Sequence, residues 1–226
     1  MTFDDGPMNL PPNPVNDNYK CNHSLTALLI EMLGEYNAKG TFNIIGTTKN
    51  NYPDRVGKVH STTWGGQKYD HYPKFGEDNE AGAFNQRELV ESLLENGHEL
   101  SNHGCRHILF GPNRLVYDKR NYFKSVHEVY SDLSSLHEYV RDNFNYTMQL
   151  SRPPHYIDKI PGGFDSYDVY AMLQYQYLAA SFDGGGWLPT EGEYSKDVDK
   201  MVKPLERALQ QSKDSLNGQI IFHKDG

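Results

Sequence analysis

Short apolar runs alternate with helix-like patterns along most of the chain, and this alternation constrains the fold more than any other feature. Apolar residues at helical spacing predict helices at about residues 25–36, 89–94, 121–142, 167–175 and 198–211. Strand-like runs lie at 41–45, 98–101, 148–151, 177–182 and 219–226, and residues 1–5 look like the end of another strand. Regular alternation of this kind predicts a parallel sheet with helices on its outer side.

The number of recognisable strands limits the architecture. Six runs can be identified, so a complete eight-stranded barrel would need strands that the pattern does not show. We therefore expect an α/β fold, a distorted or incomplete (β/α) barrel with about six to eight parallel strands. A chain of 226 residues suits one domain over residues 1–226. Because both ends lie within strand-like runs, we expect this domain to be cut from a longer protein.

One segment, residues 47–84, interrupts the alternation. It is a stretch rich in glycine, tyrosine, histidine and asparagine. A connection of this length inside a compact domain is usually functional or disordered. Because it directly follows a predicted strand, we expect a long loop insertion that forms a wall or lid over the site.

Composition narrows the class of partner. The net charge of −8 argues against a nucleic-acid-binding protein, which needs a basic face to neutralise phosphates. No apolar run approaches the roughly 18 residues of a membrane-spanning helix. A neutral or cationic partner fits better. The 16 tyrosines would suit stacking on the sugar rings of a glycan, although tyrosines also fill the cores and rims of ordinary domains.

Polar residues follow the predicted strands at five places along the chain. They are Asp4 with Asp5, the segment from His103 to His107, Arg152, Asp183 and His223. The carboxyl ends of parallel strands meet at one face of the sheet, where the active sites of α/β folds form. We therefore expect these five clusters to surround one site.

Two histidines four residues apart suggest a metal site. One helical turn puts His103 and His107 on the same side, so both can bind one ion, whereas Cys105 would point away. Such a pair is weak support alone, because histidine pairs are common on helix surfaces. Asp4 and Asp5 add carboxylates, and two histidines with one carboxylate leave positions open for water and substrate. One acid can bind the metal while the other stays free as a base.

Five short motifs span the chain. They are residues 2–7 (TFDDGP), 97–107 (GHELSNHGCRH), 152–155 (RPPH), 183–187 (DGGGW) and 221–223 (IFH). Together they resemble, in the same order, the motifs of the polysaccharide deacetylases, carbohydrate esterase family four, with its NodB homology domain. The first motif is highly specific and the next two fairly so, while the last two are weak by themselves.

The resemblance implies a metal-dependent hydrolase that removes acetyl groups from the N-acetylated sugars of a chitin-like or peptidoglycan-like glycan. Asp5, His103 and His107 would hold a divalent metal, most often zinc in this family. Asp4 would be the general base that deprotonates a metal-bound water. His223 would be the general acid that protonates the departing amine or alcohol.

The resemblance assigns four further residues. Arg152 would brace the acidic cluster, and the backbone N–H near His155 would help to bind the oxyanion. Trp187 would line the pocket for the acetyl methyl group, and Asp183 would lie behind the catalytic groups. An acetylated glycan as substrate implies an extracellular or cell-envelope location.

Three positions depart from the family pattern. Gly104 stands where the second motif usually has Ser or Thr, whose hydroxyl helps to fix the metal-binding turn. His155 replaces the usual Tyr of the third motif. Gly186 replaces the second Asp of the fourth motif, which leaves the protonation of His223 in question. None of these changes removes a metal ligand or the expected base, so we expect an active enzyme with a changed pocket.

Two alternative functions stay open. An esterase that removes O-acetyl groups from a xylan-like polysaccharide would use the same chemistry. A catalytically silent glycan-binding domain would keep the fold, and Gly186 makes this alternative conceivable. A free acid beside the metal-binding acid, as in Asp4, argues for the enzyme.

Cys21 and Cys105 are the two cysteines of the chain, and both are expected near the rim of the site. A disulfide between them is an open hypothesis for an oxidising compartment.

Overall fold

The computed structural model describes residues 1–9, 24–47, 61–64, 67–69, 80–113, 121–185 and 194–225. Its main sheet has seven strands in the order β10-β11-β1-β2-β5-β6-β9, and every neighbouring pair is parallel. These strands are β1 (Thr2–Asp4), β2 (Thr41–Ile44), β5 (Glu99–Asn102), β6 (Leu150–Ser151), β9 (Gln176–Tyr177), β10 (Phe182–Asp183) and β11 (Ile221–Lys224). The number and direction of the strands confirm the predicted α/β class.

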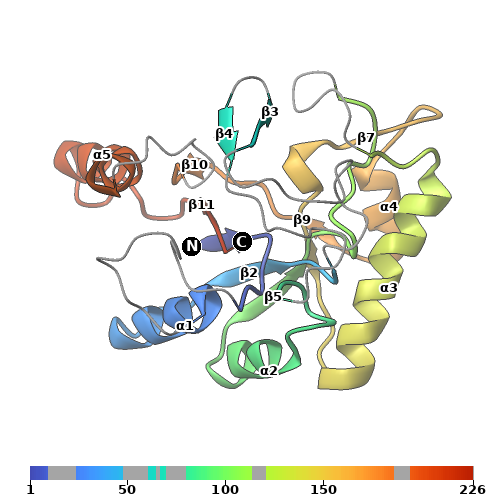
Figure 1. Ribbon diagram of the computed structural model, residues 1–226, viewed down its shortest axis with the longest axis horizontal. Coiled ribbons are helices and arrows are strands. Elements are labelled where there is room, and N and C mark those ends of the chain that lie inside the picture. Colours follow the sequence, from blue (N-terminus) through green and yellow to red (C-terminus); the bar gives the residue numbers. More distant parts are fainter. Residues whose placement is uncertain are drawn as a thin grey trace.

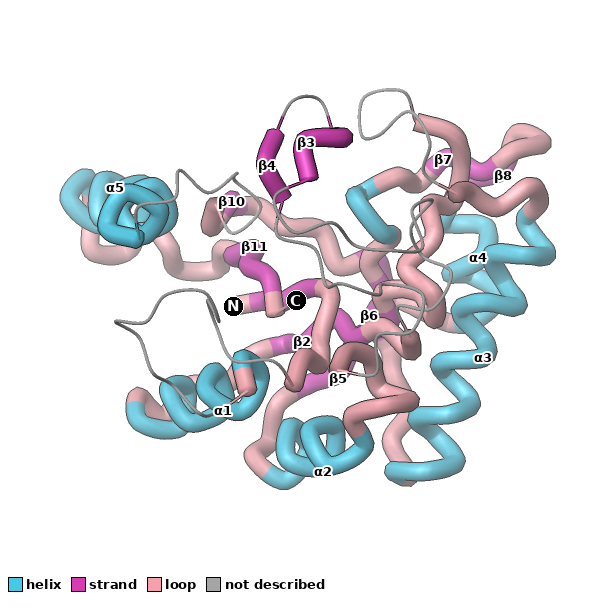
Figure 2. The backbone as a smooth tube through the Cα atoms, viewed as in Figure 1, coloured by secondary structure: helices cyan, strands magenta, loops and turns pink. Residues whose placement is uncertain are grey.

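In the described part of the chain, five α-helices lie around this sheet (Figures 1 and 2). They are α1 (Leu25–Glu35), α2 (Arg87–Glu95), α3 (Val126–Phe144), α4 (Ser166–Leu173) and α5 (Tyr194–Gln211). Each overlaps one predicted helix. Capping explains two of the starts, because Ser24 accepts a hydrogen bond from Ala27 N and Ser125 accepts one from Glu128 N.

The predicted strand at 177–182 was wrong, because the structure has two strands there. β9 and β10 lie at opposite edges of the sheet, and only residues 178–181 connect them. A flat sheet of seven strands would separate its edge strands by about 29 Å. Five Cα steps span at most roughly 17 Å. The sheet must therefore curl until its edges approach each other, which makes the fold an incomplete, distorted (β/α) barrel.

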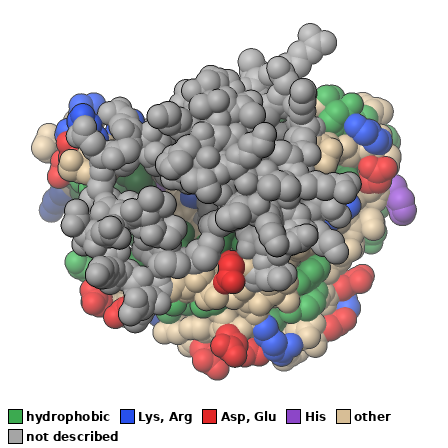
Figure 3. Space-filling model, in the orientation of Figure 1, with side chains coloured by type: hydrophobic (Ala, Val, Ile, Leu, Met, Phe, Trp, Pro, Cys, Tyr) green, Lys and Arg blue, Asp and Glu red, His purple; other side chains and the backbone are tan. Residues whose placement is uncertain are grey.

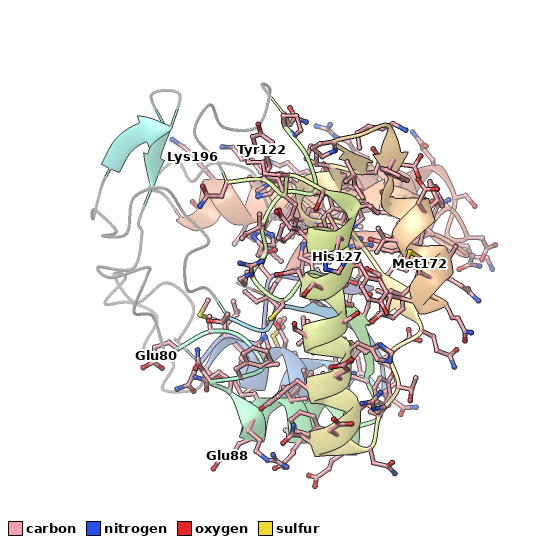
Figure 4. The ribbon with its side chains drawn as sticks, turned by 90° about the vertical axis from the view of Figure 1, so that its right-hand side faces the viewer. Glu80, Glu88, Tyr122, His127, Met172 and Lys196 are labelled. Carbon is pink, nitrogen blue, oxygen red and sulfur yellow. The ribbon has the colours of Figure 1, made fainter. Side chains whose placement is uncertain are left out.

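The core lies between the sheet and the outer helices. Phe42 of β2 and Leu100 of β5 are fully buried against Leu93 of α2 and Leu133 and Leu136 of α3. The side view shows α3 running along the molecule, with His127 on its outer surface and Met172 of α4 nearby (Figure 4). The apolar stripe of α3 thus faces the sheet, as expected of an amphipathic helix.

The predicted insertion at 47–84 is described only in part. It contains an antiparallel pair, β3 (Ser61–Trp64) and β4 (Gln67–Tyr69), at the top of Figure 1. Its last residues return to the sheet, since Gly82 N donates to Pro7 O and Ala83 N donates to Ile45 O. The segment therefore rejoins the fold beside the carboxyl ends of β1 and β2. Its role as a lid stays a prediction.

Smaller elements complete the described chain. A second antiparallel pair is formed by β7 (Lys159–Ile160) and β8 (Phe164–Asp165), and a short 3₁₀ helix covers Pro154–Tyr156. Of the described helices, none is long and apolar enough to cross a membrane. On the face seen in Figure 3, acidic side chains of described residues lie mostly along the lower rim, and basic ones lie among them and at the upper left and upper right.

Candidate active site

Three predicted metal ligands meet at the carboxyl ends of β1 and β5. Asp5 Oδ1 lies 3.2 Å from His103 Nε2 and 3.0 Å from His107 Nε2. One ligand atom from each residue lies within 4.8 Å of the others. Both histidines are buried, and Asp5 is only partly exposed. Two nitrogens and one oxygen at this separation fit a single divalent cation.

The tautomer of His103 also fits a cation. Its Nδ1 lies 2.8 Å from the carbonyl oxygen of Arg152. A carbonyl oxygen only accepts hydrogen bonds, so Nδ1 carries a proton and Nε2 is the nitrogen directed toward Asp5. Metal-binding histidines are typically oriented in this way by a bond from the other ring nitrogen.

Asp5 is held in its ionised form. Burial would raise the pKa of Asp5, but Lys224, His107 and His103 together keep it well below its usual value. Lys224 Nζ contacts Asp5 Oδ2, the oxygen that does not face the histidines. An ionised carboxylate is the form that binds metals.

The turn that carries the histidines is fixed from two sides. Asp132 of α3 accepts hydrogen bonds from Cys105 N at 2.8 Å and from Arg106 Nε at 2.7 Å. The carbonyl oxygen of Cys105 accepts from Gly46 N at 2.9 Å and from Thr47 N at 2.8 Å. Burial raises the pKa of Asp132, although its bonds to Arg106 oppose this. The buried carboxylate thus anchors the turn from the helix layer.

Gly104 departs from the family pattern for a local reason. Its φ is +87°, a left-handed conformation that side chains other than glycine rarely adopt. Its N–H donates to Asn102 Oδ1 at 2.9 Å, so a backbone bond and Asp132 fix the turn where a hydroxyl was expected to do so. The sequence signal for Asp132 is weak, because this residue lies on a distant helix.

Asp4 lies beside the ligand cluster with its charge balanced. Asp4 Oδ1 accepts from Arg152 Nη1 at 2.6 Å and from Asn43 Nδ2 at 2.5 Å. Asp4 Oδ2 lies 3.6 Å from His103 Nε2, on the side of the predicted metal ligands. Arg152 is fully buried and also donates to Thr2 Oγ1 and to the carbonyl oxygen of Leu178. The structure therefore brings Arg152 and Asp4 together as expected from the motifs.

His223 does not join this cluster. Its ring stacks on Phe3 with centroids 5.8 Å apart, and Phe3 packs into the core between sheet and helices. Burial lowers the pKa of His223, and the charge of Asp183 opposes this. Asp183 itself is exposed and accepts a hydrogen bond from Gly185 N. The His223 ring thus lies on the outer side of the sheet, whereas Asp183 is paired in register with Phe222, whose side chain faces inward.

The residue of β11 that enters the cluster is Lys224. Successive side chains of a strand point to opposite faces. Phe222 faces the Arg152 guanidinium at 5.8 Å, and Lys224 contacts Asp5, whereas His223 between them faces outward. The register pairs Asp4 with Lys224. Lys224 was missed because the fifth motif drew attention to the histidine beside it.

His155 lines the cluster from the third motif. Its ring lies 5.1 Å from the ring of His107, and its backbone is left-handed with φ of 53°. The next residue, Tyr156, also has a positive φ and covers the Arg152 guanidinium at 5.3 Å. Burial raises the pKa of Tyr156 to about 12, so its hydroxyl stays protonated.

Some residues of the motifs and of the proposed disulfide lie outside the described parts of the chain. These are Trp187, Gly186 and Cys21. Cys105 is a free, buried thiol, and burial raises its pKa to about 12. A thiol in this state is a poor metal ligand, which agrees with its expected exclusion from the ligand set.

A second buried carboxyl supports the turn after β1. Asp225 N donates to Asp4 O, and Asp225 Oδ1 accepts from Thr26 Oγ1 at 2.7 Å. A Cβ at Gly6 would overlap the Asp225 carboxyl, so only glycine fits there. Burial raises the pKa of Asp225 well above its usual value, and Asp5 adds to this effect. Sequence reasoning missed this residue because nothing near it indicated burial.

Comparisons with known proteins agree with the geometry. A family model described as polysaccharide deacetylase matches residues 1–158. A search of curated proteins finds no match. The structure of the peptidoglycan deacetylase PdaC from Bacillus subtilis is similar, with a TM-score of 0.53, 18% identity and coverage of 99% of this chain and 72% of that chain.

Two more solved structures have the same fold. The chitin deacetylase of Colletotrichum lindemuthianum has a TM-score of 0.58 at 13% identity, covering 99% of this chain and 72% of that chain. A family 4 acetyl xylan esterase from Clostridium thermocellum, in complex with a cobalt ion, has a TM-score of 0.53 at 17% identity. That match covers 100% of this chain and 72% of that chain.

Proposed function

Because the chain belongs to the polysaccharide deacetylase family, we propose that it is a metal-dependent hydrolase of N-acetylated sugars in a glycan. One observation carries this proposal: Asp5, His103 and His107 converge beside Asp4, whose carboxylate is held by Arg152. The site thus combines a ligand set with a separate ionisable acid. A chitin-like or peptidoglycan-like substrate would place the protein at the cell envelope or outside the cell.

The three ligand residues suit zinc best. Two imidazole nitrogens and one carboxylate oxygen form a typical catalytic zinc set with room for further ligands. A bound divalent cation would polarise the acetyl carbonyl and make a water molecule more acidic. Asp5 is already in the ionised form that such an ion requires, and His103 directs Nε2 toward Asp5 because Nδ1 is bound to the carbonyl oxygen of Arg152.

Asp4 would act as the general base. Its Oδ1 is occupied by Arg152 and Asn43, so Oδ2 would receive the proton of the attacking water. Arg152 keeps the carboxylate oriented and balances its charge without contact with the substrate. Its full burial means that this orientation does not depend on solvent.

The remaining predicted residues have narrower parts in the proposal. The backbone at His155 would help to bind the oxyanion, and Trp187 would line the acetyl pocket. His223 has no catalytic part in the proposal, because its ring packs on Phe3 at the outer face of β11. Asp183, which is exposed at the end of β10, has none either.

Release of acetate tests the proposal. Purified protein would be incubated with N-acetylated chitooligosaccharides, peptidoglycan fragments and O-acetylated xylan, each with and without a chelator. We expect acetate from at least one N-acetylated substrate, its loss with chelator, and its recovery when zinc is added back. Release from acetylated xylan alone would favour the O-acetyl esterase. No acetate from any substrate with folded, zinc-loaded protein would favour the silent glycan-binding domain.

A further inference from the structure

The two carboxylate oxygens of Asp5 contact different residues. Its Nζ contacts Oδ2, while Oδ1 lies 3.2 Å from His103 Nε2 and 3.0 Å from His107 Nε2. The lysine reaches this position from β11, opposite Asp4 in the register of the sheet. Its side chain is 30% exposed, so it stands at the edge of the cluster.

The charges around the cluster are balanced by this lysine. Asp4 is paired with Arg152, and Asp5 is paired with Lys224. Histidines bind a cation as neutral imidazoles, so they add no charge to the ligand set. Burial favours the uncharged form of the neighbouring Asp225. Two carboxylates thus face two cationic side chains, and the pairs together have no net charge.

We propose that Lys224 is a positioning residue for a bound divalent cation, an inference that rests on the metal site of the proposed function. The ammonium occupies Asp5 Oδ2 and so leaves Oδ1 as the one oxygen available to the cation. It also keeps a positive charge next to the site, which lowers the affinity for any cation. Carboxylates that bind metals are commonly oriented by such hydrogen-bonded partners.

Both effects predict the result of removing the ammonium. In Lys224→Met the two carboxylates would face only one cation, so the cluster would attract a divalent ion more strongly. Oδ2 of Asp5 would also become free to bind as a second oxygen. The affinity for zinc should rise, and the number of ligands around the ion should increase.

The experiment measures zinc binding by competition with a chromophoric chelator. Lys224→Met and Lys224→Gln should bind zinc at least roughly tenfold more tightly than the wild type, because each removes a positive charge that repels the ion. Lys224→Arg should stay near the wild type, because it keeps the charge. Lys159→Met is the matched control, since Lys159 is 77% exposed and paired with Asp165 away from the cluster.

The visible spectrum of the Co²⁺-loaded protein gives a second measurement, which would not change if Lys224 only stabilised the fold. Visible absorption of bound Co²⁺ weakens as ligands are added, so it should be weaker in Lys224→Met than in the wild type or in Lys159→Met. Unchanged or weaker zinc binding in both neutral variants would overturn the inference. Asp5→Ala separates the two proposals: if it binds zinc like the wild type, the metal site itself is wrong. If Asp5→Ala loses zinc while the Lys224 variants match the wild type, only the role of Lys224 is wrong.

Discussion

His223 and Lys224 are neighbours in β11, but their side chains lie on opposite faces of the sheet. The imidazole stacks on Phe3 in the outer layer, and the ammonium contacts Asp5 at the candidate active site. Alternation of side chains along a strand allows only one of two adjacent residues to face the barrel interior. The position of a histidine in the sequence motif therefore does not decide which residue faces the candidate active site.

Substitution of His223 should affect stability more than turnover. His223→Ala removes a ring that packs on Phe3, which should lower the free energy of unfolding by about 1–3 kcal/mol. The value of kcat/KM for acetate release should change less than about tenfold, below the range typical of a lost general acid. Urea unfolding and steady-state kinetics of the same preparation would measure both. A loss of about 100-fold or more in a stably folded His223→Gln protein would return the proton-donor role to this residue.

Substitutions of Asp4 and Asp5 should have different effects, on catalysis in the first case and on metal binding in the second. Asp4→Asn should lower kcat by roughly 10²- to 10⁴-fold, because an amide cannot take the proton of the attacking water. Zinc content should persist in Asp4→Asn and disappear in Asp5→Ala, as measured by elemental analysis. The Asn variant leaves Arg152 buried without its charged partner, so a loss of stability of about 3–5 kcal/mol is also expected. Equal zinc content in both variants and the wild type would contradict the ligand assignment.

Gly104→Ser restores the residue type expected of the second motif, yet it should lower the free energy of unfolding. The backbone there has φ of +87°, and a left-handed conformation costs about 1–2 kcal/mol for residues with a Cβ. Space is not the obstacle, because the nearest atom to an added Cβ is Asp132 Oδ2 at 3.4 Å. Thermal unfolding would show the loss, with Gly163→Ser as the control. Gly163 has the same φ but nothing within 4 Å of its Cβ position. A more stable Gly104→Ser protein with tighter zinc binding would contradict this explanation.

Asp225 should make stability fall as pH rises. Burial raises the pKa of Asp225 in the folded state well above its value in the unfolded chain. The folded state therefore binds the proton more tightly, and stability declines as pH rises from the unfolded pKa of about 3.9 toward the folded pKa. The slope is at most about 1.4 kcal/mol per pH unit. Asp225→Asn has no such proton, so its free energy of unfolding minus that of the wild type should increase from pH 4.5 to 8. A difference that stays constant over this range would show that Asp225 titrates normally.

Local periodicity and strand ends were enough to predict much of the architecture. Helix positions followed from apolar spacing, and Asp4 and Asp5 could be grouped with His103 and His107 because parallel strands end on one face. The choice of Asp5 as the ligand came from the resemblance to the family. The division of residues 177–182 between two sheet edges could not be predicted, because it depends on how far the sheet curls. Lys224 could not be distinguished from His223 without the register that pairs Asp4 with Lys224. Asp132 and Asp225 act through contacts between elements distant in the chain, which no local pattern records.

Arg152 forms hydrogen bonds both with the segment between the two edge strands and with Asp4 inside the barrel. Its Nε donates to the carbonyl oxygen of Leu178, in the short crossing between the two edge strands, while its Nη1 holds Asp4. The same guanidinium therefore binds the segment that joins the two edge strands of the barrel and orients the proposed base. A movement that separates the two edge strands would displace Arg152 and with it the Asp4 carboxylate. Closure of the barrel and orientation of Asp4 are therefore coupled through Arg152.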